Sequence, residues 1–126
     1  MQKHTGSCHC GAVKFEFEGP SEYKLTECNC SICIMTAYQH VFVPEEDFNI
    51  LTGEDKLKTY TFGSGAAKHM FCEICGIKAF YRPRSHPKSY SVNLRCIKPG
   101  TLTVSEIIKF DGQNWEKNIQ GLRKET

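Results

Sequence analysis

Eight cysteines stand out in this chain of 126 residues, and four of them form two close pairs. Cys8 and Cys10 are separated by one residue, Cys72 and Cys75 by two, and a glycine follows each pair directly. Such pairs place two thiolates on one side of a tight turn, where glycine adopts a backbone conformation that a side chain disfavours. Two distant pairs predict a closed site of four thiolates around zinc, joining the N-terminal strand to a hairpin near residue 72. A C-x-x-C redox centre is the alternative, although no βαβ pattern surrounds the motif.

A second group of thiols, Cys28, Cys30 and Cys33, lies within six residues. Three protein ligands with one open position distinguish a catalytic zinc site from a structural one. Zinc held in this way acts as a Lewis acid on a carbonyl oxygen, or binds an incoming thiol as a nucleophilic thiolate. Cys96 or a histidine could close the site instead and make it a second structural one. Redox sensing by the same three thiols without metal is a further alternative.

Other side chains are weaker candidates for chemistry. His40 and His69 are candidates for proton transfer because imidazole titrates near neutral pH, although histidines in strand-like runs are more often half-buried structural residues. Arg82, Arg84 and Arg95 could bind a carboxylate in bidentate fashion, or they could form a solvated rim.

Composition narrows the class of protein. Apolar residues make up 40% of the chain and charged residues 24%, which is typical of a globular domain rather than a disordered chain. The net charge of +2 argues against a dedicated nucleic-acid surface. No signal-peptide core and no membrane-length apolar run is present in the sequence, so we expect a cytoplasmic protein, with the nucleus as the alternative. Thiols usually stay reduced in both compartments.

The elements that must position these thiols are mostly extended. Residues 13–18 alternate apolar and charged side chains, which predicts a strand with one exposed face. Further strands are expected at residues 39–43, 48–51, 59–62, 68–71, 78–82, 90–94 and 102–110. Trp115, Ile119 and Leu122 have the spacing of a short amphipathic helix, and a turn of helix is expected after Ser31. One mainly-β domain over residues 1–126 is the simplest interpretation.

Three motifs carry a family resemblance. The segments G-S-C-H-C-G-A-V at residues 6–13, C-N-C-S-I-C at 28–33 and F-C-E-I-C-G at 71–76 resemble the glutathione-dependent formaldehyde-activating enzyme family. Residues 80–87 and 110–117 are more similar to its centromere protein V branch than to the bacterial enzyme. The resemblance extends over about residues 6–118, with seven cysteines in register.

The resemblance implies a zinc-binding all-β fold of several small antiparallel sheets, sometimes called a β-tent. It implies two zinc ions per chain, one structural and one catalytic. The residues matching the structural ligands are Cys8, Cys10, Cys72 and Cys75, and those matching the catalytic ligands are Cys28, Cys30 and Cys33. The implied reaction is the reversible addition of glutathione to formaldehyde, which gives S-hydroxymethylglutathione and is carbon–sulfur lyase chemistry.

The expected partners are therefore a small thiol such as glutathione and an aldehyde, and no membrane. Centromere protein V carries a long basic, proline-rich N-terminal extension, whereas this sequence starts five residues before its first motif. Binding to nucleic acid or cytoskeleton is accordingly not expected. The alternative function is a non-catalytic, zinc-stabilised interaction module, whose surface would include the basic loop from Arg82 to Lys88.

Overall fold

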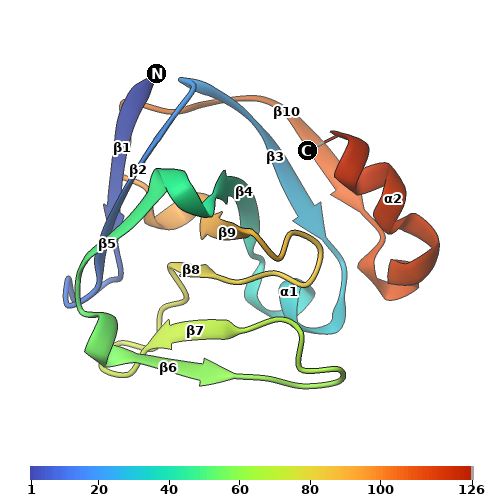
Figure 1. Ribbon diagram of the computed structural model, residues 1–126, viewed down its shortest axis with the longest axis horizontal. Helices are drawn as coiled ribbons and strands as arrows, with labels where there is room; N and C mark the ends of the chain where they lie inside the picture. Colours follow the sequence, from blue (N-terminus) through green and yellow to red (C-terminus); the bar gives the residue numbers. More distant parts are fainter. Residues whose placement is uncertain (126) are drawn as a thin grey trace.

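A polar segment at the N-terminus forms the first strand, although its sequence has no apolar alternation. In the computed structural model, which describes residues 1–125, β1 (Gln2–Ser7) pairs with β2 (Lys14–Gly19) in antiparallel fashion. On its other side β2 pairs with β5 (Phe48–Thr52), and this completes a three-stranded sheet (Figure 1). His4 is completely buried, and its Nδ1 lies 2.7 Å from the Thr101 hydroxyl. Polar contacts therefore fix a strand that apolar patterning does not reveal.

A five-stranded sheet with the order β10-β3-β4-β9-β8 lies at the centre of the molecule. Its strands are β3 (Glu22–Cys28), β4 (Gln39–Pro44), β8 (Phe80–Tyr81), β9 (Ser89–Asn93) and β10 (Thr103–Phe110). Neighbouring strands are antiparallel with one exception, the pair of β3 and β10, which is parallel and places Phe110 opposite Cys28. This pair corrects the expectation of antiparallel sheets alone. It brings the segment that follows β10 next to the end of β3.

The third sheet is the hairpin of β6 (Leu57–Tyr60) and β7 (His69–Cys72), which lies along the edge of the molecule below β8 in Figure 1. A β-bridge between Lys68 and Arg82 connects this hairpin with the end of β8. The β6–β7 hairpin is therefore attached to the edge strand of the central sheet.

Helices are short. The segment after Cys30 forms α1 (Ser31–Thr36), as expected, and α2 (Trp115–Glu125) follows β10. The remaining helical segments are the 3₁₀ turns η1 (Glu45–Asp47), η2 (Glu54–Lys56), η3 (Leu94–Cys96) and η4 (Gly112–Asn114). Ile119 and Leu122 are buried against Phe110, so the predicted amphipathic stripe is the face that α2 packs on the sheet.

The main core lies between the sheets and includes part of the cysteine set. Phe15 is completely buried, and its ring stacks on Phe48 at 5.6 Å and meets the edge of Phe80 at 5.6 Å. Cys8 and Cys72 belong to the same apolar cluster. One thiol of each close pair is thus part of the core, whereas Cys10 is exposed.

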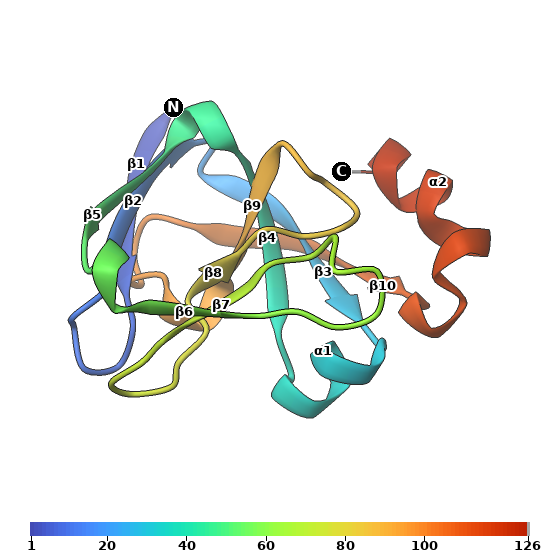
Figure 2. The same cartoon turned by 60° about the horizontal axis from the view of Figure 1, so that its bottom comes forward.

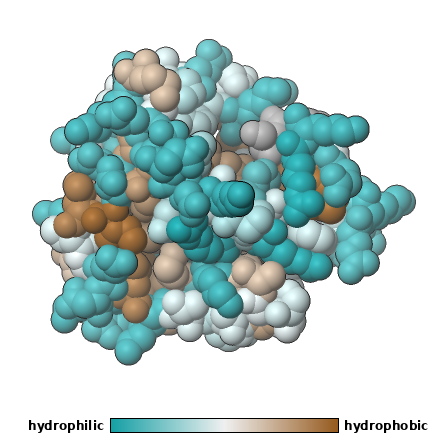
Figure 3. Space-filling model, in the orientation of Figure 1, coloured by the Kyte–Doolittle hydropathy of each residue, from teal (hydrophilic) through white to brown (hydrophobic). Residues whose placement is uncertain are grey.

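The surface gives little further information about partners. The face shown in Figure 3 is mostly hydrophilic, with an apolar area on the side of the three-stranded sheet. Within residues 1–125, no helix is long and apolar enough to cross a membrane. The mainly-β architecture with a short C-terminal helix agrees with the sequence prediction, whereas β1 and β3 were not anticipated.

Candidate metal centres and active site

The first cluster, defined as Cys8, Cys10, Cys72 and Cys75, joins two hairpins. Cys8 and Cys10 lie in the turn between β1 and β2, and Cys72 ends β7 just before Cys75. All four Sγ atoms lie within 4.8 Å of one another, and that of Cys10 is 3.7 Å from those of Cys8 and Cys72. A tetrahedral site with Zn–S bonds of about 2.3 Å places its sulfurs ~3.8 Å apart. The donor set and its spacing therefore fit a zinc ion bound by four thiolates.

The turns around the first cluster have the geometry that the sequence predicted. Gly11 and Gly76 have φ values of 81° and 77°, in the left-handed region where a side chain is strained. The Val13 amide donates a hydrogen bond of 3.3 Å to the Cys8 sulfur. Cys72 is fully buried, so the cluster is anchored in the core at one end.

The second cluster, defined as Cys28, Cys30 and Cys33, spans the junction of β3 and α1. Cys28 ends β3, Cys30 precedes α1 and Cys33 lies within it, and the three Sγ atoms lie within 4.8 Å of one another. Hydrogen bonds from the Cys28 and Cys33 thiols hold the pKa of Cys30 well below its usual range. The hydrogen bond with Cys30 raises the pKa of Cys28, and the hydrogen bonds with Cys28 and Cys30 raise that of Cys33, so the negative charge of the cluster is concentrated on Cys30.

The segment that follows β10 supports the second cluster from outside. The backbone and side-chain amides of Gln113 donate to the side-chain and backbone oxygens of Asn29, each at 3.1 Å. A Cβ atom at Gly112 would collide with the Cys28 sulfur and with Cβ of Cys30. Glycine is therefore required there by the close approach of the thiols, and the parallel pairing of β3 with β10 supplies this support.

A cavity of about 440 Å³ lies against the second cluster, and all three of its cysteines line the wall. Phe42, Phe62 and Trp115 contribute apolar surface. The loop between β6 and β7 reaches toward α2 in Figure 2, and both segments line the cavity. The hydroxyl of Thr26, also in the wall, is buried and has no hydrogen-bond partner within residues 1–125.

Cys96 lies outside the second cluster. It ends η3 and lines a different hollow that also includes Cys8. Burial raises the pKa of its thiol to about 11, with smaller contributions from Cys8 and Cys75. Cys96 is thus near the first cluster, and the alternative in which it closes the second site is wrong.

The two candidate histidines occupy different positions. The ring nitrogens of His40 lie 3.3 Å from the Cys33 sulfur and 2.7 Å from the Ser91 hydroxyl. Burial lowers the pKa of His40 to about 3, so it is neutral and supports Cys33. His69 lines the cavity, and its Nδ1 contacts Lys78, a residue that the sequence did not single out. Nothing in the local pattern distinguishes Lys78 from a surface lysine.

The three candidate arginines likewise have different surroundings. Arg82 forms an ion pair of 2.7 Å with Glu45, and Arg95 donates to Gln39 at 3.0 Å. Arg84 lines the cavity with its guanidinium 3.7 Å from the ring centre of Trp115. Among the side chains of residues 1–124, Arg84 has no carboxylate partner. It is therefore the arginine that is placed to receive an anionic ligand.

Comparisons with known proteins agree with the cysteine pattern. Residues 3–118 match the family model described as "Glutathione-dependent formaldehyde-activating enzyme". A protein of Halomonas elongata, whose name provisionally assigns it to the same enzyme, is 56% identical over 32 residues, which are 25% of this chain and 20% of that protein. The crystal structure of a Rhodobacter sphaeroides protein superimposes with a TM-score of 0.69 at 33% identity, over 76% of this chain and 89% of the other.

Gly112→Ala tests whether the segment after β10 holds the second cluster. The added methyl group must displace Cys28 or Cys30, so we expect the bound metal to fall by about one ion per chain without any change of ligand. Elemental analysis of the purified protein measures this, and Gly121→Ala is the matched control because a Cβ there meets nothing within 4 Å. Unchanged metal content in Gly112→Ala would contradict this role of the segment.

Proposed function

The chain belongs to the glutathione-dependent formaldehyde-activating enzyme family, and we propose that it catalyses the reversible addition of glutathione to formaldehyde. The thiol sulfur attacks the aldehyde carbon and S-hydroxymethylglutathione forms, and the reverse reaction is that of a carbon–sulfur lyase. The observation that carries the proposal is the second cluster, whose three thiols line a cavity of about 440 Å³. This volume lies within the range of small-molecule sites.

We assign zinc to both clusters, two ions per chain, within a single zinc-binding domain over residues 1–126. The first cluster has four thiols and reaches into the core, which supports a structural ion. The second cluster has three thiols and lines the cavity, which supports a catalytic ion with one position left for substrate. Free thiols in both clusters favour a reducing compartment, the cytoplasm or the nucleus.

Zinc bound at the second cluster supplies a Lewis acid that favours the thiolate form of a thiol ligand. The chain's own residues bind and orient that thiol. Phe42, Phe62 and Trp115 give the cavity apolar walls, beside which electrostatic interactions are stronger than in bulk water. Thr26 is buried behind the same wall.

Arg84 is the residue that we expect to bind a carboxylate of glutathione. Its guanidinium is stacked on Trp115 in the cavity wall and has no carboxylate partner within the described part of the chain. Stacking leaves the edge of the guanidinium, which carries its five donors, free to bind a carboxylate in bidentate fashion. Arg84 would then favour thiols that carry a carboxylate over neutral ones.

Arg84→Gln should raise KM for glutathione about 10-fold with kcat nearly unchanged, because a charge-assisted hydrogen bond contributes roughly 1.5–3 kcal/mol and this site is partly exposed. KM for cysteamine, a thiol without a carboxylate, should stay within about twofold. Arg82→Gln is the control, since Arg82 is already paired with Glu45. An equal effect on both thiols, or no effect on either, would contradict the assignment.

Substitution of one ligand in each cluster separates the structural ion from the catalytic one. Cys72→Ser should lower the melting temperature strongly or prevent folding, because structural zinc contributes folding free energy directly. Cys30→Ser should lose the second ion and keep most of the stability. Thermal unfolding with zinc analysis measures both effects, and the opposite ranking would reverse the two assignments.

Exchange NMR spectroscopy tests the activity itself. In an equilibrium mixture of glutathione and formaldehyde, zinc-loaded protein should accelerate the interconversion with S-hydroxymethylglutathione, and Cys30→Ser should not. Absence of acceleration with several small thiols and aldehydes would contradict the proposal and leave the non-catalytic interaction module as the alternative. A metal content of about one zinc per chain would favour redox chemistry at the second cluster.

A further inference from the structure

The imidazole ring of His69 is held in the cavity wall by contacts on its ring faces and on one of its edges. The residue is 5% exposed, and its ring is stacked with Tyr81 at 4.9 Å and with Phe62 at 5.4 Å. Its Nδ1 lies 2.7 Å from Nζ of Lys78. Lys78 is not among the residues that line the cavity. The edge that carries Nε2 is therefore the part of the imidazole left for a ligand.

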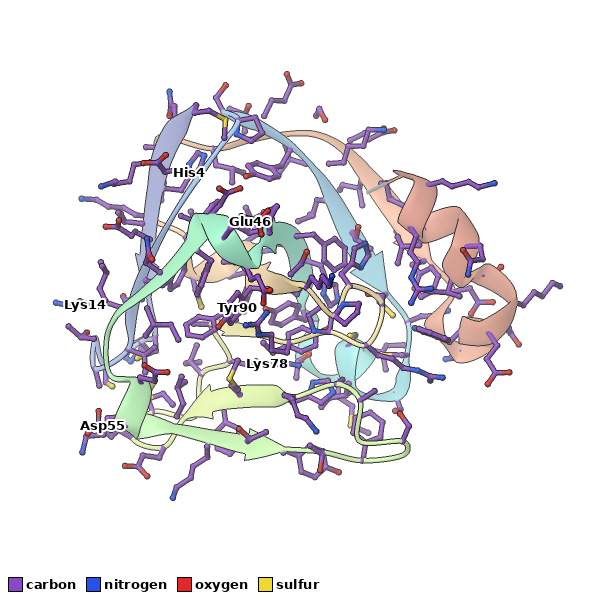
Figure 4. The ribbon with its side chains drawn as sticks, in the orientation of Figure 1. His4, Lys14, Glu46, Asp55, Lys78 and Tyr90 are labelled. Carbon is purple, nitrogen blue, oxygen red and sulfur yellow. The ribbon has the colours of Figure 1, made fainter. Side chains whose placement is uncertain are left out.

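Lys78 determines which ring nitrogen of His69 carries the proton. Figure 4 shows Lys78 near the centre of the molecule, whereas Lys14 projects from its edge. Nζ of Lys78 lies 3.8 Å from the ring centre of Tyr81, and it forms no ion pair with the side chains of residues 1–124. Burial lowers the pKa of Lys78 to about 8, so at neutral pH it is mostly an ammonium group, which has donors only. Nδ1 must accept, and the ring proton is on Nε2.

His69 is itself neutral in this arrangement. Burial, and secondly the charge of Lys78, lower its pKa to about 4. The side chain thus presents a neutral N–H donor to the same cavity that the second cluster lines. His40 cannot act in this way, because both of its ring nitrogens are occupied by Cys33 and Ser91.

We propose that His69 is the catalytic proton donor to the aldehyde oxygen, and that Lys78 is the positioning residue that fixes its Nε2–H tautomer and renews its proton. The proposal rests on the proposed function, since it names the group that protonates the product of thiol addition. General acid catalysis of this kind typically contributes about 10²–10⁴-fold to a rate.

The protons and electrons balance along the Lys78–His69 pair. The carbon–sulfur bond forms as the carbonyl π pair moves onto oxygen, and this oxygen takes the proton from Nε2 of His69. Lys78 passes one proton to Nδ1, so the imidazole stays neutral and Lys78 becomes an amine. The proton that the next thiol loses returns to Nε2, and the Nδ1 proton returns to Lys78. The net reaction adds the thiol S–H across the C=O bond.

Four variants test the pair against a control. His69→Phe keeps the aromatic stack and removes the donor, whereas His69→Gln keeps an amide donor without the connection to Lys78. Lys78→Met removes the ammonium group and Lys78→Arg keeps a cation. Lys14→Met is the control, an exposed lysine distant from the cavity. Zinc content, the melting temperature and the Kd of glutathione are measured for each variant.

We expect kcat for exchange to fall ~100-fold in His69→Phe and ~10-fold in Lys78→Met. Lys78→Arg and His69→Gln should retain more activity than these two, and the Kd of glutathione should change less than twofold in all. Nitrogen chemical shifts give a second measurement that does not depend on activity. They should show the Nε2–H tautomer of His69 in the unmodified chain and a tautomer mixture in Lys78→Met.

The outcomes separate this proposal from the proposed function. If the unmodified chain accelerates exchange and the folded, zinc-loaded His69 variants are equally active, the proton-donor role is wrong while the proposed function stands. An Nδ1–H tautomer in the unmodified chain would also overturn it. If the unmodified chain shows no acceleration, both proposals fall.

Discussion

The approach of the β1–β2 turn to the end of β7 is the contact on which the rest of the structure depends. The Cys10 sulfur on the first hairpin lies 3.7 Å from the Cys72 sulfur on the second, although 61 residues separate the two pairs in the sequence. A domain of this size buries a limited apolar core, so a metal that links distant segments contributes strongly to folding. The β6–β7 hairpin, which ends at Cys72, also carries His69, so the structural ion that we propose would fix one wall of the cavity as well.

The opposite wall depends on a different long-range contact, the parallel pairing of β3 with β10. This pairing places Phe110 beside Cys28 and lets the Gly112–Gln113 segment hold Asn29 in the loop of the second cluster. The second cluster is thus built from residues close in sequence but supported by residues some 80 positions away. The thiols that line the cavity are not those that belong to the main core, which is consistent with the separate structural and catalytic roles that we propose for the two clusters.

The sequence predicted the local features well. The close cysteine pairs, the Cys28–Cys33 cluster, the glycine turns and the stripe of α2 follow from spacing over a few residues, and each is present, while the meeting of the two distant pairs follows from their complementary number of thiols. It did not predict β1, whose buried His4 sits in a polar segment, or β3, whose pairing with β10 is non-local. The contact of Lys78 with His69 could not be predicted from the sequence either. The two residues lie on either side of the turn that contains Cys75, and they meet only in the folded chain. Cys96 likewise required the fold to show that it lies on the side of the first cluster.

The central claim is that the second cluster binds zinc with one position open to a thiol on the cavity side. A crystal structure of the zinc-loaded protein soaked with glutathione, with anomalous data collected at the zinc edge, tests this directly. We predict two zinc peaks per chain, one enclosed by the four sulfurs of the first cluster. The other should be bound by Cys28, Cys30 and Cys33 together with the sulfur of glutathione. A second peak closed by a fourth protein ligand, or no peak at the second cluster, would contradict an open zinc site at the second cluster.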